Sequence, residues 1–399
     1  MTVAEEAWVL ALGALPVSEG LRLRDAAEVR FFKGTDPTRF HDLCGIADLD
    51  AFLTGDGART PRVGLADSRR QGRPGVPYAD YTTSEDGPID LPRLFALYDA
   101  GATLVLSHMH QMLPALGRFC RGLEQIFLHA VQCNIYLTPP GAQGFRVHYD
   151  THDVLILQVQ GEKLWRFWPT PAVPFANEHT PWEDQPSPDE EPQSQMLRPG
   201  DVLYVPRGML HDAASQGAQS SLHLTVGLLG ESWGDALRAA LDVMEREEAT
   251  LRQPFPTWRL AEGGISDDLM REAAKRLSAL GAAKVMELMS QQLLTRLATE
   301  QMPMVSRGLI APSVSPTDRL ALSETVHHFV TPRPEGTAQL RWAGGNVTLS
   351  AQEFEWIARI GEGATANDLG GPEALAFCQR LASYGLVAVQ PVTAMKAAE

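Results

Sequence analysis

The sequence predicts an α+β protein whose core is a double-stranded β-helix, the jelly-roll arrangement found in cupins. Short apolar runs separated by turn residues fill residues 131–230, and several short strands at this spacing indicate a sandwich or barrel. From Ser232 the apolar period becomes helical, with Trp233, Leu237 and Met244 on one face. A set of candidate metal ligands inside the β-rich part narrows the prediction to a jelly roll, which can enclose such a site.

Strands in the β-rich part are expected at residues 131–137, 146–148, 154–160, 164–167, 202–205 and 222–229. Upstream, the pattern predicts short strands at residues 31–34, 59–64 and 102–107 and helices over 91–100 and 113–122. Asp90 precedes the first of these helices as a candidate N-cap, and Gly101 follows it where helices commonly end. The strands at 31–34 and 59–64 are expected at a sheet edge.

Three residues form the candidate metal site. His148 and Asp150 are two positions apart at an expected strand start, so they should project from one face. His211 follows a Pro-Gly-Asp turn and a short strand, and is expected at the start of the next strand. Two histidines and one carboxylate hold Fe(II) and leave three coordination positions open. The alternative for His148 and Asp150 alone is a surface loop pair, and the addition of His211 favours the metal site.

The other histidines near this pattern are weaker candidates. His108 and His110 are two positions apart, but they precede a helix and have no acidic partner beside them. His152 lies close enough to the expected site to contact a substrate. His223 falls on the last core strand, where we expect a buried histidine with satisfied hydrogen bonds rather than a ligand.

Composition narrows the functional class. The chain has 399 residues, is 44% hydrophobic and carries a formal net charge of -15, which disfavours non-specific nucleic-acid binding. No apolar run is long enough to span a membrane and no signal peptide is apparent. Four cysteines are far apart and form no CxxC motif, so neither a disulfide framework nor a zinc site is expected (Cys44, Cys120, Cys133 and Cys378). A reduced, cytoplasmic protein fits these observations.

Residues 169–195 form an insertion between two expected strands. The insertion is rich in proline and in acidic residues and contains no Lys or Arg. A solvated surface loop is one interpretation. The other is a lid over the site, and its negative charge would then favour a basic substrate.

The second half of the chain is expected to hold two further domains. Residues 231–315 are predicted to be helical and to form a dimer interface, with one helix beginning near Ser266 and ending at Gly281. Residues 316–399 read as a strand, two helices with a Gly-rich break between them, and a terminal strand, which is typical of a winged-helix-like module. Its acidic residues favour a structural or protein-binding role over DNA binding, and the last five residues are expected to fray.

Several motifs together resemble the JmjC ribosomal oxygenases, which are Fe(II)- and 2-oxoglutarate-dependent enzymes that hydroxylate ribosomal proteins on an Arg or His side chain. The resemblance lies in residues 133–140, 144–150, 160–166, 198–201 and 206–225. Outside this core it is weaker but follows the domain order of the family: a catalytic domain at 1–230, a helical dimerisation domain at 231–315 and a winged-helix-like domain at 316–399. It implies a dioxygenase that uses Fe(II), 2-oxoglutarate and O2, acts on a protein or peptide, including a ribosomal protein, and forms a homodimer.

The resemblance also implies residue roles. His148, Asp150 and His211 would hold the iron. Lys163 would pair with the distal carboxylate of 2-oxoglutarate, as suits a compact ammonium in a dry pocket; otherwise it is an exposed turn lysine. The remaining cosubstrate pocket would be lined by Asn134, Tyr136 and Thr225.

Two of the cosubstrate-pocket assignments have alternatives in the residues themselves, and two features depart from the family. Asn134 could instead cap a turn, and Tyr136 could be packed in the core. Gly227 departs from the expected pattern, because it stands where a polar residue would touch the cosubstrate. The insertion at 169–195 has no counterpart that we can assign in the family.

Function has alternatives too. The first is an oxygenase that acts on a small molecule or on a peptide natural product in biosynthesis. The second is a non-enzymatic, metal-binding cupin that serves as an interaction protein. A methyl-lysine demethylase ranks below hydroxylation, because the sequence has no recognisable aromatic cage or histone-reader motif.

Overall fold

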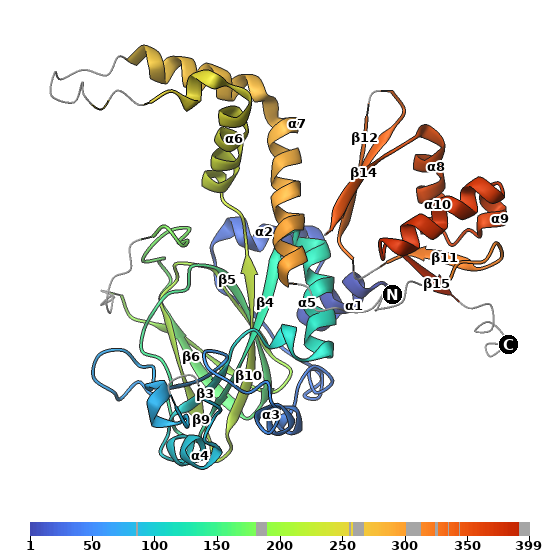
Figure 1. The fold of residues 1–399 in the computed structure, drawn as a ribbon. Helices are drawn as coiled ribbons and strands as arrows, with labels where there is room; N and C mark the ends of the chain where they lie inside the picture. The colour runs from blue at the N-terminus through green and yellow to red at the C-terminus, as the bar shows by residue number, and fades with distance from the viewer. Residues whose placement is uncertain are drawn as a thin grey trace. The chain divides into compact units, whose positions relative to one another are not determined.

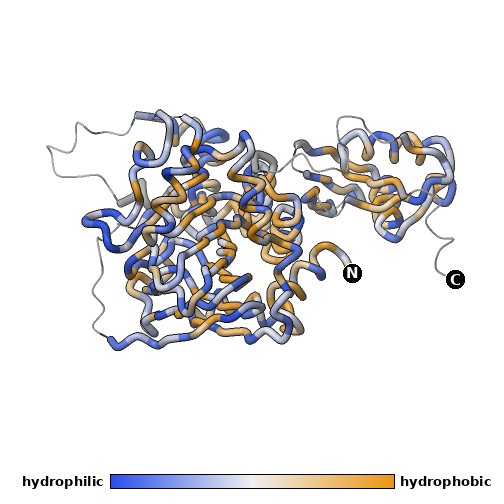
Figure 2. The backbone as a smooth tube through the Cα atoms, turned by 90° about the horizontal axis from the view of Figure 1, so that it is seen from below, coloured by the Kyte–Doolittle hydropathy of each residue, from blue (hydrophilic) through white to orange (hydrophobic). Residues whose placement is uncertain are grey.

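The computed structural model describes residues 1–84, 87–180, 190–254, 257, 267–300, 313–323, 326–333, 335–342 and 344–390. The middle of the acidic insertion, the expected helix start at Ser266 and the tail after residue 390 lie outside these residues. The chain divides into two compact units, residues 1–230 and 231–399, and each is described by itself (Figure 1). Figure 2 shows hydrophobic stretches inside each unit and hydrophilic ones along the surface loops.

The first unit is organised around a seven-stranded antiparallel sheet. Its three longest strands lie side by side, because β5 and β4 pair with the two sides of β10, and β10 is therefore in the middle of the sheet. In spatial order the sheet contains β1 (Arg30–Phe32), β8 (Val202–Val205), β5 (Asp153–Gln160), β10 (Ser221–Leu229), β4 (Ala130–Thr138), β3 (Thr103–Leu106) and β2 (Val63–Ala66).

A smaller antiparallel sheet of the same unit completes the jelly roll. It contains β7 (Gln193–Leu197), β6 (Glu162–Phe167) and β9 (His211–Gln216), with β6 in the middle. Gly161, with φ of 66°, makes the tight turn from β5 into β6. A Cβ there would lie 2.4 Å from the Ser220 carbonyl oxygen, so glycine is required where the chain passes from one sheet to the other.

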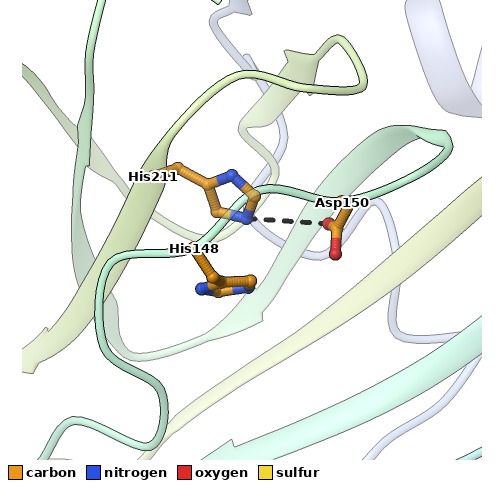
Figure 3. A group of neighbouring side chains, drawn as sticks. All are labelled: His148, Asp150 and His211. Atoms are coloured by element: carbon orange, nitrogen blue, oxygen red, sulfur yellow. Dashed lines mark ion pairs between the residues drawn. The ribbon is translucent and has the colours of Figure 1, made fainter. Parts of the chain in front are cut away.

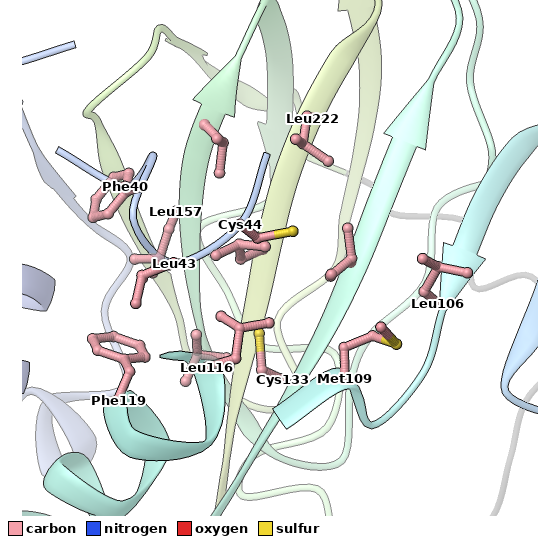
Figure 4. Packing of buried hydrophobic residues seen from close by; sticks show 14 of the residues in the cluster. Phe40, Leu43, Cys44, Leu106, Met109, Leu116, Phe119, Cys133, Leu157 and Leu222 are labelled. Atoms are coloured by element: carbon pink, nitrogen blue, oxygen red, sulfur yellow. The ribbon is translucent and has the colours of Figure 1, made fainter. Parts of the chain in front are cut away.

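Helices pack on one face of the large sheet and form the main core with it. These are α1 (Val3–Leu12), α2 (Val17–Ala26), α3 (Ile46–Leu53), α4 (Leu91–Asp99) and α5 (Pro114–Phe127), with 3-10 turns η1 (Tyr78–Asp80) and η2 (Met109–Gln111). Leu116 and Phe119 of α5 are buried in one cluster with Leu157 and Leu222 of the sheet (Figure 4). Asp90 caps α4, as expected, by accepting a hydrogen bond from the Arg93 N–H.

Strict alternation along the strands separates this core from the opposite face. On β10, Leu222, Leu224 and Val226 belong to the helix-covered core. The intervening His223 and Thr225 line a cavity instead. Successive residues of a strand point to opposite faces, so a single strand supplies both the core and the cavity wall.

Five of the six strands expected in the β-rich part are confirmed as β4, β5, β6, β8 and β10. The strand expected at residues 146–148 is wrong: this segment is loop, with one isolated bridge between His148 and His211. The predicted C-terminal boundary of the insertion at 169–195 is also wrong, because Gln193–Leu197 forms a strand, β7, that pairs with β6. Its polar residues obscured the strand pattern.

The second unit contains two long helical segments followed by a mixed part. α6 (Trp233–Glu247) begins with a capping box at Ser232 and Asp235, and a 3-10 turn η3 (Ala249–Arg252) follows. α7 (Asp267–Glu300) is interrupted at Gly281, where φ is 71° and ψ is 156°. The helix break expected at Gly281 is therefore confirmed.

The mixed part has its own hydrophobic core, which includes Leu340, Trp356 and Phe377. Its strands are β11 (Arg319–Leu322), β12 (His328–Pro332), β13 (Ala338–Trp342), β14 (Gly345–Leu349) and β15 (Val387–Gln390), and its helices are α8 (Ala351–Gly361), α9 (Ala366–Leu369) and α10 (Pro372–Ser383). β12, β13 and β14 form one sheet, while β11 pairs with β15. Of the helices in the described residues, none has the length and apolar character needed to span a bilayer.

Candidate metal centre

The backbone brings the two histidines of the candidate site together. His148 lies in the loop after β4, and His211 is the first residue of β9. Each donates its backbone N–H to the other's carbonyl, at 3.1 Å and 2.8 Å, and their ring centroids are 4.5 Å apart. Residues paired in this way in an antiparallel bridge place their side chains on the same face. The two imidazoles therefore lie side by side even though no strand forms at residues 146–148.

Both imidazoles are oriented by the same local device. The Nδ1–H of His148 donates to the Arg146 carbonyl at 2.7 Å, and the Nδ1–H of His211 donates to the Met209 carbonyl at 2.9 Å. A carbonyl can only accept, so Nδ1 carries the proton and the lone pair is left on Nε2. Metal-binding histidines are commonly fixed in this way by a second hydrogen bond.

Asp150 supplies the third donor group. Its Oδ2 lies 3.6 Å from His211 Nε2 (Figure 3), and one donor atom from each of His148, Asp150 and His211 lies within 4.8 Å of the others. The Asp150 carbonyl accepts the Gly208 N–H at 2.8 Å, which ties the loop to the turn before β9. The prediction that these three residues converge is thus met by the geometry, although a loop positions Asp150.

Electrostatics favour the protonation states that bind a divalent ion. Burial lowers the pKa of His211 to about 4, so this imidazole is neutral at neutral pH. Burial alone would raise the pKa of Asp150, but the neighbouring His211 and His148 outweigh it and the net pKa is lowered. A neutral imidazole and an ionised carboxylate are the forms that coordinate metals.

The three donor residues line a cavity of about 570 Å³. Its walls come from both sheets of the first unit: Val154 and Ile156 from β5, Ala213 from β9, and Trp165 from β6. These side chains make much of the cavity wall apolar. A loop far away in the sequence, residues 72–75, also contributes to the lining.

Lys163 lies in the same cavity and is buried, with 4% of its surface exposed. Its Nζ donates to Thr138 Oγ1 at 2.9 Å and lies 3.5 Å from His223 Nδ1. No carboxylate of the described residues forms an ion pair with it. Burial lowers the pKa of Lys163 to about 7. The alternative of an exposed turn lysine is therefore wrong, and the ammonium is available to an anionic ligand.

Two other expected cosubstrate contacts, Tyr136 and Thr225, also line the cavity. The Tyr136 ring stacks on His223, with centroids 4.9 Å apart and an interplanar angle of 7°. Asn134 is not among the lining residues. Its Oδ1 accepts the backbone N–H of His108 at 2.9 Å, and its side chain is hydrogen-bonded to the Tyr136 hydroxyl. Asn134 therefore caps a turn and supports Tyr136 through a hydrogen bond to its hydroxyl.

The role of His223 in the cavity was not predicted from the sequence. It is buried, as expected, but it lines the cavity between Tyr136 and Lys163. The alternation of β10 was the available signal, because His223 is two residues from Thr225. Trp165 could have been found in the same way, since it is two residues from Lys163.

The remaining histidines and Gly227 lie away from the lining. His110 is buried, and its Nδ1 accepts the Cys133 N–H at 3.1 Å, so it is a structural residue. A Cβ on Gly227 would come within 2.7 Å of the His152 ring. Glycine at 227 thus makes room for His152, and the expectation that position 227 faces the cosubstrate is not supported by the lining of the cavity.

Comparison with known proteins shows which domain and which relatives the chain resembles. A model of the JmjC domain matches residues 106–235, which include all three donor residues. Ribosomal oxygenase 1 of Rattus norvegicus is 32% identical over 241 residues, which cover 59% of this chain and 38% of that protein. The chain therefore carries a JmjC domain and is similar to the ribosomal oxygenases.

Two further relatives bear on the extent of the likeness. The bifunctional lysine-specific demethylase and histidyl-hydroxylase NO66 of Aedes aegypti is 26% identical over 315 residues, 77% of this chain and 48% of that protein. The X-ray structure of E. coli ycfD is 15% identical, covers 94% of this chain and 99% of that one, and superimposes with a TM-score of 0.53. This last likeness is one of fold. The chain spans less than half the length of ribosomal oxygenase 1 and of NO66.

Proposed function

We propose that this protein is an Fe(II)- and 2-oxoglutarate-dependent oxygenase that hydroxylates an amino-acid side chain of a protein. The observation that carries the proposal is the shared cavity. The donor groups of His148, Asp150 and His211 lie in it together with the buried ammonium of Lys163, which forms no ion pair with a carboxylate of the described residues. A metal site alone would need no buried cation nearby. A cavity that holds both is suited to a metal and an anionic chelating ligand.

The donor set fits iron. Two imidazoles with free Nε2 lone pairs and one carboxylate are the 2-His-1-carboxylate triad of non-haem Fe(II) oxygenases. In this chain the three groups are His148, Asp150 and His211, and all three come from one side of the cavity, the loop after β4 and the start of β9. The opposite side of the metal position is left open to other ligands.

The same cavity also has groups that fit 2-oxoglutarate. Lys163, held by Thr138, would pair with the distal carboxylate, and the hydroxyl groups of Tyr136 and Thr225 lie along the same wall. A charged hydrogen bond to a carboxylate in a buried pocket is stronger than a neutral one. A volume of about 570 Å³ lies within the usual range of ligand pockets, roughly 300–1,000 Å³.

When bound, the iron and 2-oxoglutarate supply the O2-dependent oxidation, and the protein supplies position and shielding. His148 and His211 hold their Nε2 atoms toward the metal position because their Nδ1–H groups are fixed by carbonyls. Lys163 would hold the cosubstrate by its distal carboxylate. The apolar walls of Val154, Ile156 and Trp165 limit access of water to the reacting groups.

The substrate that we propose is a protein side chain, including one of a ribosomal protein. Support comes from the relatives, which are named as ribosomal oxygenase and as histidyl-hydroxylase. One relative is also named as a lysine-specific demethylase; the alternatives of a small-molecule or peptide substrate remain for the test to exclude. The described part of the insertion is acidic, with Glu178, Glu190 and Glu191 exposed, which favours a basic substrate segment.

The test is turnover. Purified protein with Fe(II), 2-oxoglutarate and O2 should release succinate, and ribosomal proteins incubated with it should gain one oxygen atom on a single residue by mass spectrometry. Succinate without modification of any ribosomal protein would move the proposal to another protein, peptide or small molecule. Binding of metal without any succinate would favour the non-enzymatic cupin.

We also propose that the second unit serves assembly. A dimer through residues 231–315 is supported by the apolar side chains that α6 leaves exposed, Trp233, Leu237 and Leu241. Residues 316–399 would then form a winged-helix-like module that binds protein rather than nucleic acid. Light scattering of the purified chain tests the dimer, and a Trp233→Glu, Leu237→Glu variant should be monomeric. A cytoplasmic location stays a prediction.

A further inference from the structure

The loop between β2 and α4 contains a segment, residues 67–76, that forms part of the rim of the metal cavity. This rim loop contributes Gly72, Arg73, Pro74 and Gly75 to the cavity lining. Its ends are joined by a bridge between Ala66 and Gly75 and by a hydrogen bond from the Asp67 N–H to the Pro74 carbonyl at 2.8 Å. The rim loop is therefore a closed turn whose tip lies against the site.

The side chain of Arg146 binds the backbone of the rim loop. Its guanidinium donates to three carbonyls of the loop: from Nε to Ser68 at 2.8 Å, from Nη1 to Gly72 at 2.8 Å, and from Nη2 to Arg70. Arg146 forms no ion pair with any carboxylate of the described residues, and it lines the cavity. A planar fork of donors fits three converging carbonyls in a way that the point charge of lysine does not.

The same residue also touches the metal centre. The carbonyl of Arg146 accepts the Nδ1–H of His148 at 2.7 Å. The side chain thus fixes the rim loop while the backbone fixes the ring of a donor histidine two residues later. Any shift of residue 146 changes both the cavity wall and the direction of His148 Nε2.

We infer that Arg146 is a positioning residue, which couples the rim loop at residues 67–76 to the imidazole of His148 and so sets the cavity entrance and the metal geometry together. The metal half of this inference rests on the proposed function. The loop half does not, because it depends only on hydrogen bonds within the protein.

Arg62 offers a matched control. It is half-buried like Arg146, and its guanidinium donates to backbone carbonyls of another turn, those of Ser107 at 3.4 Å and His108 at 3.0 Å. Arg62 does not line the cavity. Arg62→Lys and Arg146→Lys therefore make the same chemical change in two arginine clamps, only one of which faces the site.

The experiment is hydrogen exchange of the metal-free protein, followed by mass spectrometry, together with titration by Co(II). In Arg146→Lys the protected amides of Asp67, Ser68 and Val76 should exchange faster by on the order of tenfold, because charge-assisted hydrogen bonds that close the loop are lost. The Kd for Co(II) should rise, by up to roughly tenfold, as for loss of a group that orients a ligand. In Arg62→Lys neither quantity should change at residues 67–76 or at the metal site.

Three results would overturn the inference: unchanged exchange of the rim loop in Arg146→Lys, unchanged Co(II) affinity, or equal loosening of the rim loop in Arg62→Lys.

If Arg146→Lys does not fold, Ser68→Ala provides a second variant. It removes the 2.8 Å bond from Ser68 Oγ to the Gln143 carbonyl, which lies on the same loop anchor. This variant should raise rim-loop exchange by a smaller factor, and no rise would contradict the anchoring. Failure of the wild-type protein to bind Co(II) would instead contradict the metal site, and loop exchange would still decide the clamp.

Discussion

The two faces of the seven-stranded sheet are made by alternate residues of the same strands, yet they differ in kind. One face, represented by Leu222 and Leu224 of β10, packs against helices in a dry core. The other face, represented by the buried His223 and the half-buried Thr225, lines the cavity with polar groups. Burying polar groups and a cation destabilises a protein unless they are paired. The cavity face therefore makes sense as a binding surface, and the helix-covered face as the source of stability.

The largest expected effect is on the cavity face. His211→Ala removes a donor group, and succinate formation should fall by more than about a hundredfold, beyond the effect of losing a group that only orients a metal ligand. His110→Gln is the control, because His110 is also buried but accepts a hydrogen bond from Cys133 and lies off the cavity. Retained turnover in His211→Ala would contradict the assignment of the site.

The next prediction compares substitutions at two adjacent residues of β10, one on each face of the sheet. Leu224→Ala should lower the free energy of unfolding by about 2–5 kcal/mol, because it opens a void in a core where Leu224 is fully buried. Thr225→Val keeps the shape of its side chain and should change stability by less than about 1 kcal/mol. Urea unfolding of the two variants measures both values, and a similar loss in each would show that the faces do not differ as described.

Lys163→Met probes the cation of the cavity face. Loss of one charge-assisted hydrogen bond should weaken 2-oxoglutarate binding by roughly tenfold to a hundredfold. Metal affinity should change little, because Lys163 is not a donor residue. Isothermal titration of the metal-loaded variant with 2-oxoglutarate gives the value, and unchanged affinity would place the cosubstrate elsewhere.

The most gradual effect is on the pH dependence of stability. The unfolded chain keeps Lys163 protonated up to its ordinary pKa of 10.5, whereas burial lowers the pKa in the folded protein to about 7. Between these values the unfolded state binds more protons, so this residue makes stability rise with pH, by at most about 1.4 kcal/mol per pH unit. Lys163→Met should remove that rise from the unfolding free energy of the metal-free protein. An identical pH profile in the variant would mean that Lys163 is not buried as a cation.

Burial also changes the pH at which one donor residue, His211, becomes protonated. The unperturbed pKa of histidine predicts loss of metal binding in mild acid, but burial lowers the pKa of His211 to about 4. In the folded protein this ligand therefore stays neutral further into acid than the sequence suggested. Between pH 6.5 and about 4 the unfolded chain takes up the proton first, so the metal-free protein loses stability as the pH falls through this range.

Much of the fold was predictable because hydrophobic period and turn residues are local signals. The strands at residues 154–160 and 202–205, the Asp90 cap and the break at Gly281 could all be read directly. The donor set could be predicted from spacing, even though the strand expected at residues 146–148 does not form.

What could not be predicted depends on contacts between distant segments. The rim loop at residues 67–76 is held at the cavity by the side chain of Arg146 and by hydrogen bonds from Ser68 to the Gln143 carbonyl, and nothing local in the sequence marks these partners. Asn134 is turned away from the cavity by the backbone of His108, which adopts a left-handed conformation with φ of 55°. Residues of this kind require the tertiary structure, because their role is set by which remote backbone group they meet.

The central claim is that one divalent ion binds to His148, Asp150 and His211. The most direct measurement is anomalous X-ray diffraction from crystals grown with Co(II) and 2-oxoglutarate. The account predicts a single strong anomalous peak within coordination distance of these three side chains, with ligand density running from the peak to Lys163. A peak at other residues, or no peak in a crystal whose solution sample binds Co(II), would contradict it.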